Sequence, residues 1–424
     1  MANARKIALK ALCDVRSGGA YSNITLNKYL SENDLSSSDK AFATALFYGV
    51  LDRTITLDFI LSRYIKTPLK KVSSDALENL RIALYQIMYM DKIPHSAAVN
   101  EAVKIIKNSK YKHLSGFTNG VLRNILREGT ALPSDTDAKS LSIIYSCPEW
   151  IVNSFLDDYG LDNTVSLLEY SLQTPPVILR VNTLKTTADD LIDILSQENI
   201  SAKYAKIENA LELTCGIDVT KSVAYSKGLF HVQDIASQTV VNILSPSENE
   251  RVLDVCAAPG GKTFTMAQYM QNKGEIIACD LYDKRTNLIK KGAFRLGITN
   301  IKAIQNDATV KNDEFGSFDV ILCDVLCSGL GVIRRKPEIK YKDISEYDDI
   351  TVIQSKILET ASNYLKDNGR ILYSTCTLRK CENEDVIERF LDKYPQYELK
   401  YQRTFMPHID GSDGFYCALL QKSR

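Results

Sequence analysis

Hydrophobic side chains recur every three or four positions along the first 128 residues, and Gly and Pro are confined to short breaks such as Ile93-Pro94. This period places apolar residues on one face of a helix and polar residues on the other. Two such stripes consist of Leu77, Leu80, Leu84, Ile87 and Met88, and of Val99, Ala102, Val103 and Ile106. We predict a compact, all-helical bundle over residues 1–130.

The pattern becomes mixed after this bundle. The stretch REGTALPSDTDAKS (127–140) is polar and contains Gly and Pro, and we predict a linker over residues 131–146. A helix near 149–159, a strand at 177–182 and a helix after Thr187 are expected next. Short strands are expected around 202–213 and 229–232. Together these elements predict a small α+β subdomain over residues 147–232.

Five apolar runs, separated by helical stretches, follow from Arg251 onward. They are RVLDVC, EIIACD, IKAIQND, FDVILCD and RILYSTC, and each reaches a polar residue or a cysteine at its end. Continuous apolar runs between helices are typical of strands buried on both faces of a parallel sheet. We therefore predict a doubly wound α/β domain over residues 233–424, with ligands at the carboxyl ends of the strands.

Charge is distributed unevenly between these regions, although the formal net charge of the 424 residues is zero. Residues 1–128 carry 19 Lys and Arg against 11 Asp and Glu, and the remainder carries 33 against 41. A basic module joined to an acidic one favours a nucleic-acid-binding attachment. An uneven scatter of solvated charges is the simpler alternative.

Nothing in the sequence indicates a membrane or an export route. The first residues form an amphipathic pattern without the continuous apolar core of a signal peptide, and no run approaches the roughly 18 apolar residues of a membrane span. The ten cysteines include no CxxC motif. We expect reduced thiols and a cytoplasmic location.

A loop of small residues, CAAPGGK, joins the first predicted strand of the α/β domain to the next helix. Such a loop lets a ligand approach the backbone, and the helix N-terminus attracts negative charge. CAAPGGKT departs from the P-loop pattern GxxxxGK[ST] only where Cys256 replaces Gly. The loop could therefore bind either a nucleotide phosphate or S-adenosylmethionine. Asp280 and Asp307 end the next two strands, where carboxylates suit ribose and adenine better than a triphosphate. They favour S-adenosylmethionine over ATP.

Cys327 and Cys376 follow the fourth and fifth strands, which are neighbours in a doubly wound sheet. Burial in the core, a zinc site, a redox role and nucleophilic catalysis are alternatives for each thiol. The spacings of 323–327 and 376–381 match no common zinc motif, and we expect no metal. A thiolate that adds to C6 of cytosine makes C5 nucleophilic enough to accept a methyl group. Asp324 can hydrogen-bond or protonate N3 of the base.

These motifs closely resemble the RsmB/Sun type of 16S ribosomal RNA cytosine-5 methyltransferases, in the larger family that contains the nucleolar Nop2 proteins. The most specific matches are VLDVCAAPGGKT, CDVLCSGLGVIRRKPEIK and YSTCTL followed by ENED. IPHSAAVNEAVKIIK and FTNGVLRNILR resemble a NusB-type RNA-binding domain, and PPVILRVNTLK and GLFHVQDIASQ resemble the approach to the catalytic domain. The resemblance spans nearly the whole chain and implies a Rossmann-like class I methyltransferase domain.

The resemblance also implies roles for individual residues, which the thiol chemistry alone does not rank. It implies that Cys376 is the nucleophile, that Cys327 assists release and that Asp324 activates the base. Arg334, Arg335 and Lys336 are expected to hold phosphates. The implied cofactor contacts are Cys256, Ala257, Ala258, Pro259, Gly260, Gly261, Lys262, Asp280, Arg285, Asp307 and Asp324.

One position departs from the family pattern Asp-Ala-Pro-Cys-Ser-Gly, because Val325 and Leu326 replace Ala and Pro. Proline restricts φ, and its loss costs about 0.4–1 kcal/mol in chain entropy. We expect S-adenosylmethionine-dependent methylation of cytosine C5 in 16S ribosomal RNA by a monomer, with ribosomal RNA or an assembly intermediate as partner. An RNA-dependent P-loop ATPase and a noncatalytic RNA-binding ribosome-assembly factor are the alternatives.

Overall fold

The computed structural model describes residues 4–18, 22–214 and 218–423. The chain forms two compact units. The first comprises Met1–Leu172 together with Lys336–Lys342, and the second comprises Gln173–Arg335 together with Asp343–Arg424. The chain therefore leaves the second unit once, for seven residues, between two of its catalytic-domain segments.

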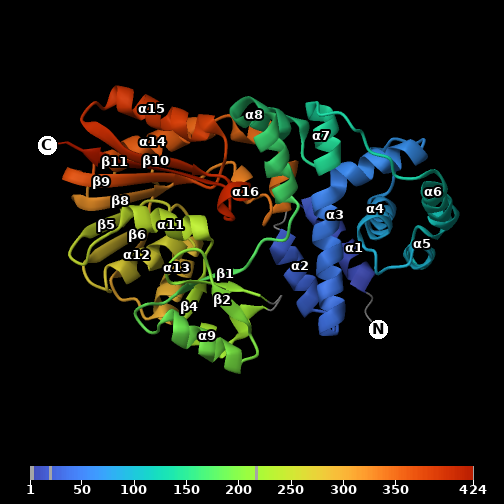
Figure 1. Ribbon diagram of the computed structural model, residues 1–424, viewed down its shortest axis with the longest axis horizontal. Helices are drawn as coiled ribbons and strands as arrows, with labels where there is room; N and C mark the ends of the chain where they lie inside the picture. The colour runs from blue at the N-terminus through green and yellow to red at the C-terminus, as the bar shows by residue number, and fades with distance from the viewer. Residues whose placement is uncertain (1–3, 19–21, 215–217, 424) are drawn as a thin grey trace. The chain divides into compact units, whose positions relative to one another are not determined.

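The first unit is helical, as the apolar stripes predict (Figure 1). Its core contains the buried faces of α1, α3, α4, α5 and α6. Arg81 is buried within this bundle, where its guanidinium pairs with Asp58 at 2.7 Å and with Glu78. The helices are α1 (Ala4–Gly18), α2 (Ser22–Ser31), α3 (Ser37–Tyr64), α4 (Ser74–Tyr89), α5 (His95–Lys107) and α6 (Ser115–Glu128), with 3-10 turns at Leu69–Lys71 and Lys112–Leu114.

The second half of the expected linker is also helical. α7 (Ala138–Tyr145) begins after Asp137, whose carboxylate accepts hydrogen bonds from two backbone N–H groups of the first turn. Leu141 is buried, and the Thr56 hydroxyl donates to the Ile143 carbonyl at 2.6 Å. α8 (Glu149–Ser171) follows and changes direction at Gly160. The polar composition of residues 127–140 hides this helix because only a few of its side chains reach the core.

A small antiparallel sheet opens the second unit, in the order β2-β3-β1-β4. One face of the sheet packs on α9 through a cluster that includes Leu179, Leu195 and Leu211. This arrangement confirms the strands and the helix expected between residues 177 and 232. The elements are β1 (Ile178–Val181), α9 (Ala188–Gln197), β2 (Ala202–Tyr204), β3 (Ala210–Leu213), the turn Val219–Lys221, α10 (Val223–Ser226) and β4 (Phe230–Val232).

A seven-stranded sheet in the order β10-β11-β9-β8-β5-β6-β7 forms the core of the second unit. The five strands from β7 to β9 are parallel, and they are the five apolar runs of the sequence. β11 is antiparallel to both β9 and β10, a pair the sequence patterns do not predict. The strands are β5 (Arg251–Asp254), β6 (Glu275–Asp280), β7 (Ile301–Gln305), β8 (Phe318–Asp324), β9 (Leu365–Thr375), β10 (Tyr397–Phe405) and β11 (Phe415–Lys422).

Helices cover both faces of this sheet (Figure 1). α11 (Ile235–Leu244), α12 (Gly261–Tyr269) and α13 (Asp283–Leu296) cover one face, and α14 (Ile350–Ser362) and α15 (Glu384–Lys393) cover the other. This is the predicted doubly wound, Rossmann-like architecture, with its ligand edge at the carboxyl ends of β5–β9. Across the residues described, none of the helices is both long and apolar enough to cross a membrane.

Candidate active site

The loop between β5 and α12 carries the motif CAAPGGK. The Ala258–Pro259 peptide bond is cis, and Gly260 has φ +112°. A Cβ atom on Gly260 would lie 2.3 Å from the Phe264 ring, so the loop requires glycine both for its backbone conformation and for its packing. Because α12 begins at Gly261, the first backbone N–H groups of the helix have no partner within it and are available to a ligand.

Asp280 ends β6, the parallel neighbour of β5, and is 3% exposed. Its carboxylate accepts a hydrogen bond from the Tyr282 backbone N–H at 3.1 Å and lies 3.2 Å from the Arg285 guanidinium. Arg285 also donates to the Ala258 carbonyl at 2.8 Å. Arg285 thus connects the small-residue loop to the acidic end of the next strand.

Asp307 follows β7 and is exposed. One oxygen of its carboxylate accepts hydrogen bonds from the Thr309 backbone N–H at 2.9 Å and from the Thr309 hydroxyl at 2.7 Å. Since β5, β6, β7 and β8 are parallel neighbours, their carboxyl ends share one edge of the sheet. The structure therefore brings the loop, Asp280, Asp307 and Asp324 to a single edge, as predicted.

Asp324 ends β8 and makes two side-chain contacts. The Lys262 ammonium donates to Oδ2 at 2.7 Å, and the Ser374 hydroxyl donates to Oδ1 at 2.8 Å. Asp324 and Ser374 face each other in the parallel register of β8 and β9. The carboxylate is fixed from the loop side by Lys262 and from the neighbouring strand by Ser374.

Cys327 and Cys376 meet at this edge, with their Sγ atoms 3.1 Å apart. The hydrogen bond between the two thiols raises the pKa of Cys327 well above its ordinary value, and burial raises it further. Cys327 therefore retains its proton, and its S–H group can donate to the Cys376 sulfur. The two cysteines that sequence reasoning singled out form one pair.

Glu382, which the sequence reasoning did not assign, fixes the loop that carries Cys327. It is 0% exposed, and its carboxylate accepts hydrogen bonds from the Ser328 backbone N–H at 2.9 Å and from the Gln354 amide at 3.0 Å. The Gly331 backbone N–H donates to the Cys376 carbonyl at 3.0 Å. The acidic run ENED after YSTCTL was the available signal. Glu382, its first residue, lies only six positions after Cys376 and could have been predicted to contact the cysteine loops.

Asp254, at the end of β5, is a second unassigned carboxyl group. The Thr263 hydroxyl donates to its Oδ2 at 2.7 Å, while its Oδ1 is buried and has no partner among the residues described. Burial raises the pKa of Asp254 to about 7. This carboxyl supports the base of the small-residue loop from inside the sheet.

Models of three protein families match consecutive parts of the chain. The NusB family matches residues 2–127, the ferredoxin-like domain of RsmF/B-like methyltransferases matches residues 147–220, and 16S rRNA methyltransferase RsmB/F matches residues 241–421. The probable ribosomal RNA small subunit methyltransferase B of Bacillus subtilis is 37% identical, over 99% of this chain and 98% of its own length. The chain belongs to this methyltransferase B family.

Other relatives agree with this family assignment. The probable methyltransferase B of Synechocystis is 33% identical over the full length of both chains. The crystal structure of PH0851 has a TM-score of 0.85 at 24% identity, covering 100% of this chain and 99% of that one, and it supports the fold alone. The chain is therefore a ribosomal RNA methyltransferase that uses S-adenosylmethionine.

The geometry of this methyltransferase corrects one expectation from the sequence. Arg334, Arg335 and Lys336 were expected to hold phosphates, but of the three only Lys336 is exposed, and Arg334 is buried 3.4 Å from Asp413. Arg335 pairs with Asp413 at 2.6 Å and with Asp234 at 3.0 Å, and it donates to the Pro176 carbonyl. The two guanidinium groups pair with carboxylates inside the second unit, and these carboxylates compensate the burial of their charge.

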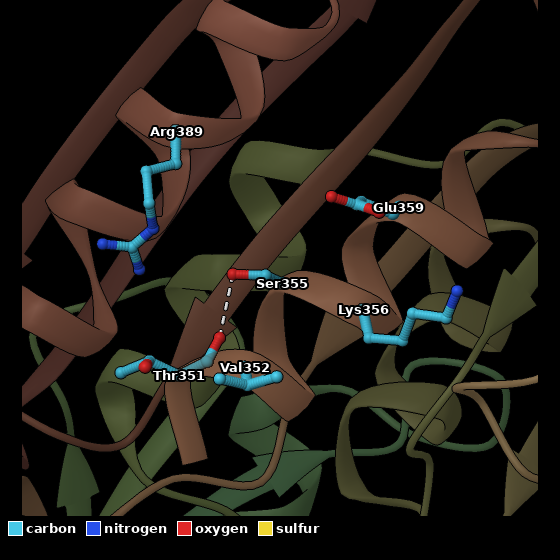
Figure 2. Close-up of a pocket in the computed structure, with 6 residues that line it drawn as sticks. All are labelled: Thr351, Val352, Ser355, Lys356, Glu359 and Arg389. Atoms are coloured by element: carbon cyan, nitrogen blue, oxygen red, sulfur yellow. Dashed lines mark hydrogen bonds between the residues drawn. The ribbon is translucent and has the colours of Figure 1, made fainter. Parts of the chain in front are cut away.

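A hollow of about 310 Å³ lies apart from the methyltransferase site, between α14 and α15 (Figure 2). It is lined by Thr351, Val352, Ser355, Lys356, Glu359 and Arg389, none of which belongs to the strand-end site.

Across residues 4–18, 22–214 and 218–423, no group of three His, Cys, Asp or Glu side chains could hold a metal ion. None of the nine cysteines in those ranges forms a disulfide, and Cys215 lies outside the described residues.

Proposed function

We propose that the chain methylates C5 of a cytosine in 16S ribosomal RNA through a covalent adduct with Cys376. The observation that carries this proposal is the 3.1 Å contact between the Cys327 and Cys376 sulfurs, next to the fixed carboxylate of Asp324. A methyltransferase that acts on an oxygen or an exocyclic amine has no need of two thiols. Cytosine C5 does need one, because it is a poor nucleophile until a thiolate adds to C6.

The cofactor site is assigned to the loop Cys256–Lys262 and to Asp280, Arg285, Asp307 and Asp324. Gly260 gives the loop its left-handed backbone conformation, which a residue with a Cβ atom could not adopt without striking Phe264. The buried carboxylate of Asp280, held by Arg285, suits a pair of ribose hydroxyl groups. Bound S-adenosylmethionine supplies an electrophilic methyl group on a sulfonium.

Cys376 carries out the attack. Only about 3% of an ordinary thiol is ionised at pH 7, so the nucleophile needs assistance. The raised pKa of Cys327 keeps a proton on that sulfur, from which it can donate to a Cys376 thiolate. The Cys376 sulfur then bonds to C6 of the base, and the electron pair of the C5–C6 double bond becomes available to C5.

Asp324 assists this addition at N3 of the base. Attack at C6 pushes negative charge toward N3 and O2, and Asp324 in its protonated form donates a proton to N3 and recovers it when the Cys376–C6 bond breaks. Lys262 and Ser374 hold the carboxylate in one orientation. Asp324 therefore acts on the base while Lys262 connects it to the cofactor loop.

Release of the product returns the thiol to its starting state. C5 then bears both a methyl group and a proton, and removal of that proton restores the C5–C6 double bond as the Cys376–C6 bond breaks. Because Cys327 is protonated, we assign the proton transfer to a water molecule that Cys327 orients. Cys327 is thus the release residue and Cys376 the nucleophile.

The target cytosine must be unstacked, because attack at C6 comes from the face of the ring. The excess of basic residues in the first 128 positions supports binding of folded RNA by the helical unit.

We also propose that the protein acts in the cytoplasm as a monomer. Light scattering at micromolar concentration tests the monomer.

Bisulfite mapping of 16S ribosomal RNA tests the proposed reaction. Cells that lack the protein should lose one 5-methylcytosine, which the wild-type gene and a Cys13→Ser variant should restore. Cys13 is a matched control because it is a thiol of the helical unit. Cys376→Ser should not restore the mark. A methyl group found on a different atom, or full restoration by Cys376→Ser, would refute the proposal.

A further inference from the structure

The loop that carries Cys327 continues directly into Lys336–Lys342, which belongs to the first unit. Arg335 before this segment and Asp343 after it belong to the second unit. The chain is therefore joined covalently to the helical unit nine residues beyond Cys327. The contacts at each end of this segment show how firmly it is held.

Three side chains of Lys336–Lys342 are anchored in the first unit. Lys340 is 1% exposed, and its ammonium donates to the Asp52 carbonyl at 3.0 Å and lies 3.6 Å from the Asp52 carboxylate. The Tyr341 hydroxyl donates to the Leu51 carbonyl at 2.5 Å. The Ser22 hydroxyl donates to the Glu338 carboxylate at 2.8 Å, and Arg16 lies over the Tyr341 ring at 5.1 Å.

The burial of Lys340 is the decisive feature. Lysine is almost never fully buried unless its charge is paired, and the ammonium here has one carbonyl and one carboxylate of Asp52 at the C-terminal half of α3. An exposed loop crossing a surface would not need this arrangement. The segment Pro337–Tyr341, a 3-10 helix, is thus a fixed part of the helical unit.

The chain is held equally firmly just before this segment, on the second unit. Arg334 and Arg335 pair with Asp413, and Arg335 also pairs with Asp234. Gly331 donates to the Cys376 carbonyl, and its own carbonyl accepts from the Gly414 backbone N–H at 2.9 Å. Lys336 alone separates the arginine pairs from the 3-10 helix. On each side of the Arg335–Lys336 bond, the chain is therefore held by contacts within its own unit.

We propose that Lys336–Lys342 is a strap through which the helical unit positions the Cys327 loop, with Lys340 as its positioning residue. Lys340 touches neither the base nor the cofactor, and it acts through the backbone between itself and Cys327. RNA bound to the helical unit then influences the rate of the thiol chemistry rather than the affinity for S-adenosylmethionine. The effect on catalysis rests on the proposed function, whereas the mechanical connection does not.

The test compares three full-length variants: Lys340→Met, Tyr341→Phe and Lys342→Met. Lys342 is the exposed last residue of the strap and serves as the matched control. Alkylation of Cys327 and Cys376 by iodoacetamide, followed by mass spectrometry without RNA, reports the thiol loop directly. Mutations in coupled elements typically change rates or equilibria at the other site by about 2- to 30-fold. We expect the rate of Cys327 alkylation to change by such a factor in Lys340→Met. Lys342→Met should match the wild type.

Single-turnover methylation under saturating RNA and cofactor is the second measurement. Lys340→Met should lower this rate by about the same factor, with unchanged dissociation constants for both ligands. Tyr341→Phe removes only the hydrogen bond to Leu51 and keeps the test valid if Lys340→Met does not fold. It should change both readouts in the same direction, less strongly.

Two outcomes would overturn the strap. One is wild-type alkylation and methylation rates in Tyr341→Phe and in folded Lys340→Met; the other is an equal change in Lys342→Met. The two proposals can fail separately. If the wild-type protein transfers no methyl group but Lys340→Met still changes the rate of Cys327 alkylation, the proposed function is refuted and the strap is supported.

Discussion

Replacing Gly260 by Ala tests whether the cofactor loop depends on one glycine or on its general composition. The adjacent Gly261 provides a matched control, because the same substitution one residue later meets a different environment. Gly260 has a φ of +112°, whereas Gly261 has no positive φ and begins α12. The two variants add the same methyl group to the same loop.

The structure gives the size of the expected difference. A side chain at a φ that favours glycine costs about 1–3 kcal/mol. The new Cβ atom on Gly260 would also lie 2.3 to 2.9 Å from three atoms of the Phe264 ring, and overpacking of this kind costs about 1–3 kcal/mol. We expect Gly260→Ala to lose about 2–6 kcal/mol of unfolding free energy.

Gly261→Ala should have the opposite sign. Its Cβ atom would lie 3.7 Å from the nearest atom, the amide nitrogen of Gln233, which is an ordinary contact distance. Alanine is favoured over glycine within a helix by up to about 1 kcal/mol. The stability of this variant should therefore equal or slightly exceed that of the wild type.

Thermal unfolding of the cofactor-free protein, followed by far-ultraviolet circular dichroism, measures both variants. At about 2–4 °C per kcal/mol for domains of 150–250 residues, Gly260→Ala should lower the Tm of the second unit by at least about 4 °C. The single tryptophan, Trp150 on α8, belongs to the first unit, so its fluorescence midpoint should stay unchanged. Equal shifts in the two variants would refute the reasoning.

Three further predictions concern the thiol loop and the sheet. Cys327→Ala should trap an RNA–protein adduct that survives a denaturing gel, and its absence with normal turnover would exclude a release role. Burial raises the pKa of Asp254 to about 7, so the folded protein keeps a proton that the unfolded chain loses near pH 4. The contribution of Asp254 to the free energy of unfolding therefore falls as the pH rises from about 4 to 7. Urea unfolding across that range should show a smaller decline in Asp254→Asn than in wild type. Leu326→Pro should raise the urea midpoint, by about 0.4–1 kcal/mol of unfolding free energy, and an unchanged or lower midpoint would contradict this.

Much of the second unit could be predicted because its signals are local. An apolar run that ends in Asp324 or Cys376 carries its own evidence of a buried strand with a chemical group at its end. Parallel neighbours then bring such ends together without further information, since their carboxyl ends share one edge. The meeting of Cys327 and Cys376 followed from this rule and from the predicted doubly wound strand order, in agreement with the family resemblance.

The features that sequence reasoning missed depend on partners far away in the chain. β11 pairs antiparallel with both β9 and β10, β10 is exposed over most of its length, and this pairing carries no sequence motif. In the sequence, Arg335 lies in a basic run and is therefore interpreted as a phosphate ligand. Its actual partner, Asp413, is 78 residues away along the chain. The fate of a basic side chain depends on which carboxylates the fold brings to it, so a basic run beside an active site does not by itself predict an RNA contact.

Leu326 illustrates how the fold compensates for a departure from a family motif. Proline at this position would restrict the backbone beside Cys327. Here the Val325 backbone N–H donates to the Ser374 carbonyl at 3.0 Å, and the Leu326 carbonyl accepts from the Gln354 amide at 2.9 Å. The same Gln354 amide also donates to Glu382, which in turn holds the N–H group of the residue after Cys327. Hydrogen bonds from β9, α14 and the segment after Cys376 therefore fix the loop on both sides of Leu326. These contacts fix the folded loop without proline, whereas the chain entropy that proline would remove from the unfolded state is not recovered, and the Leu326 side chain itself, 48% exposed, contributes little to fixing the loop.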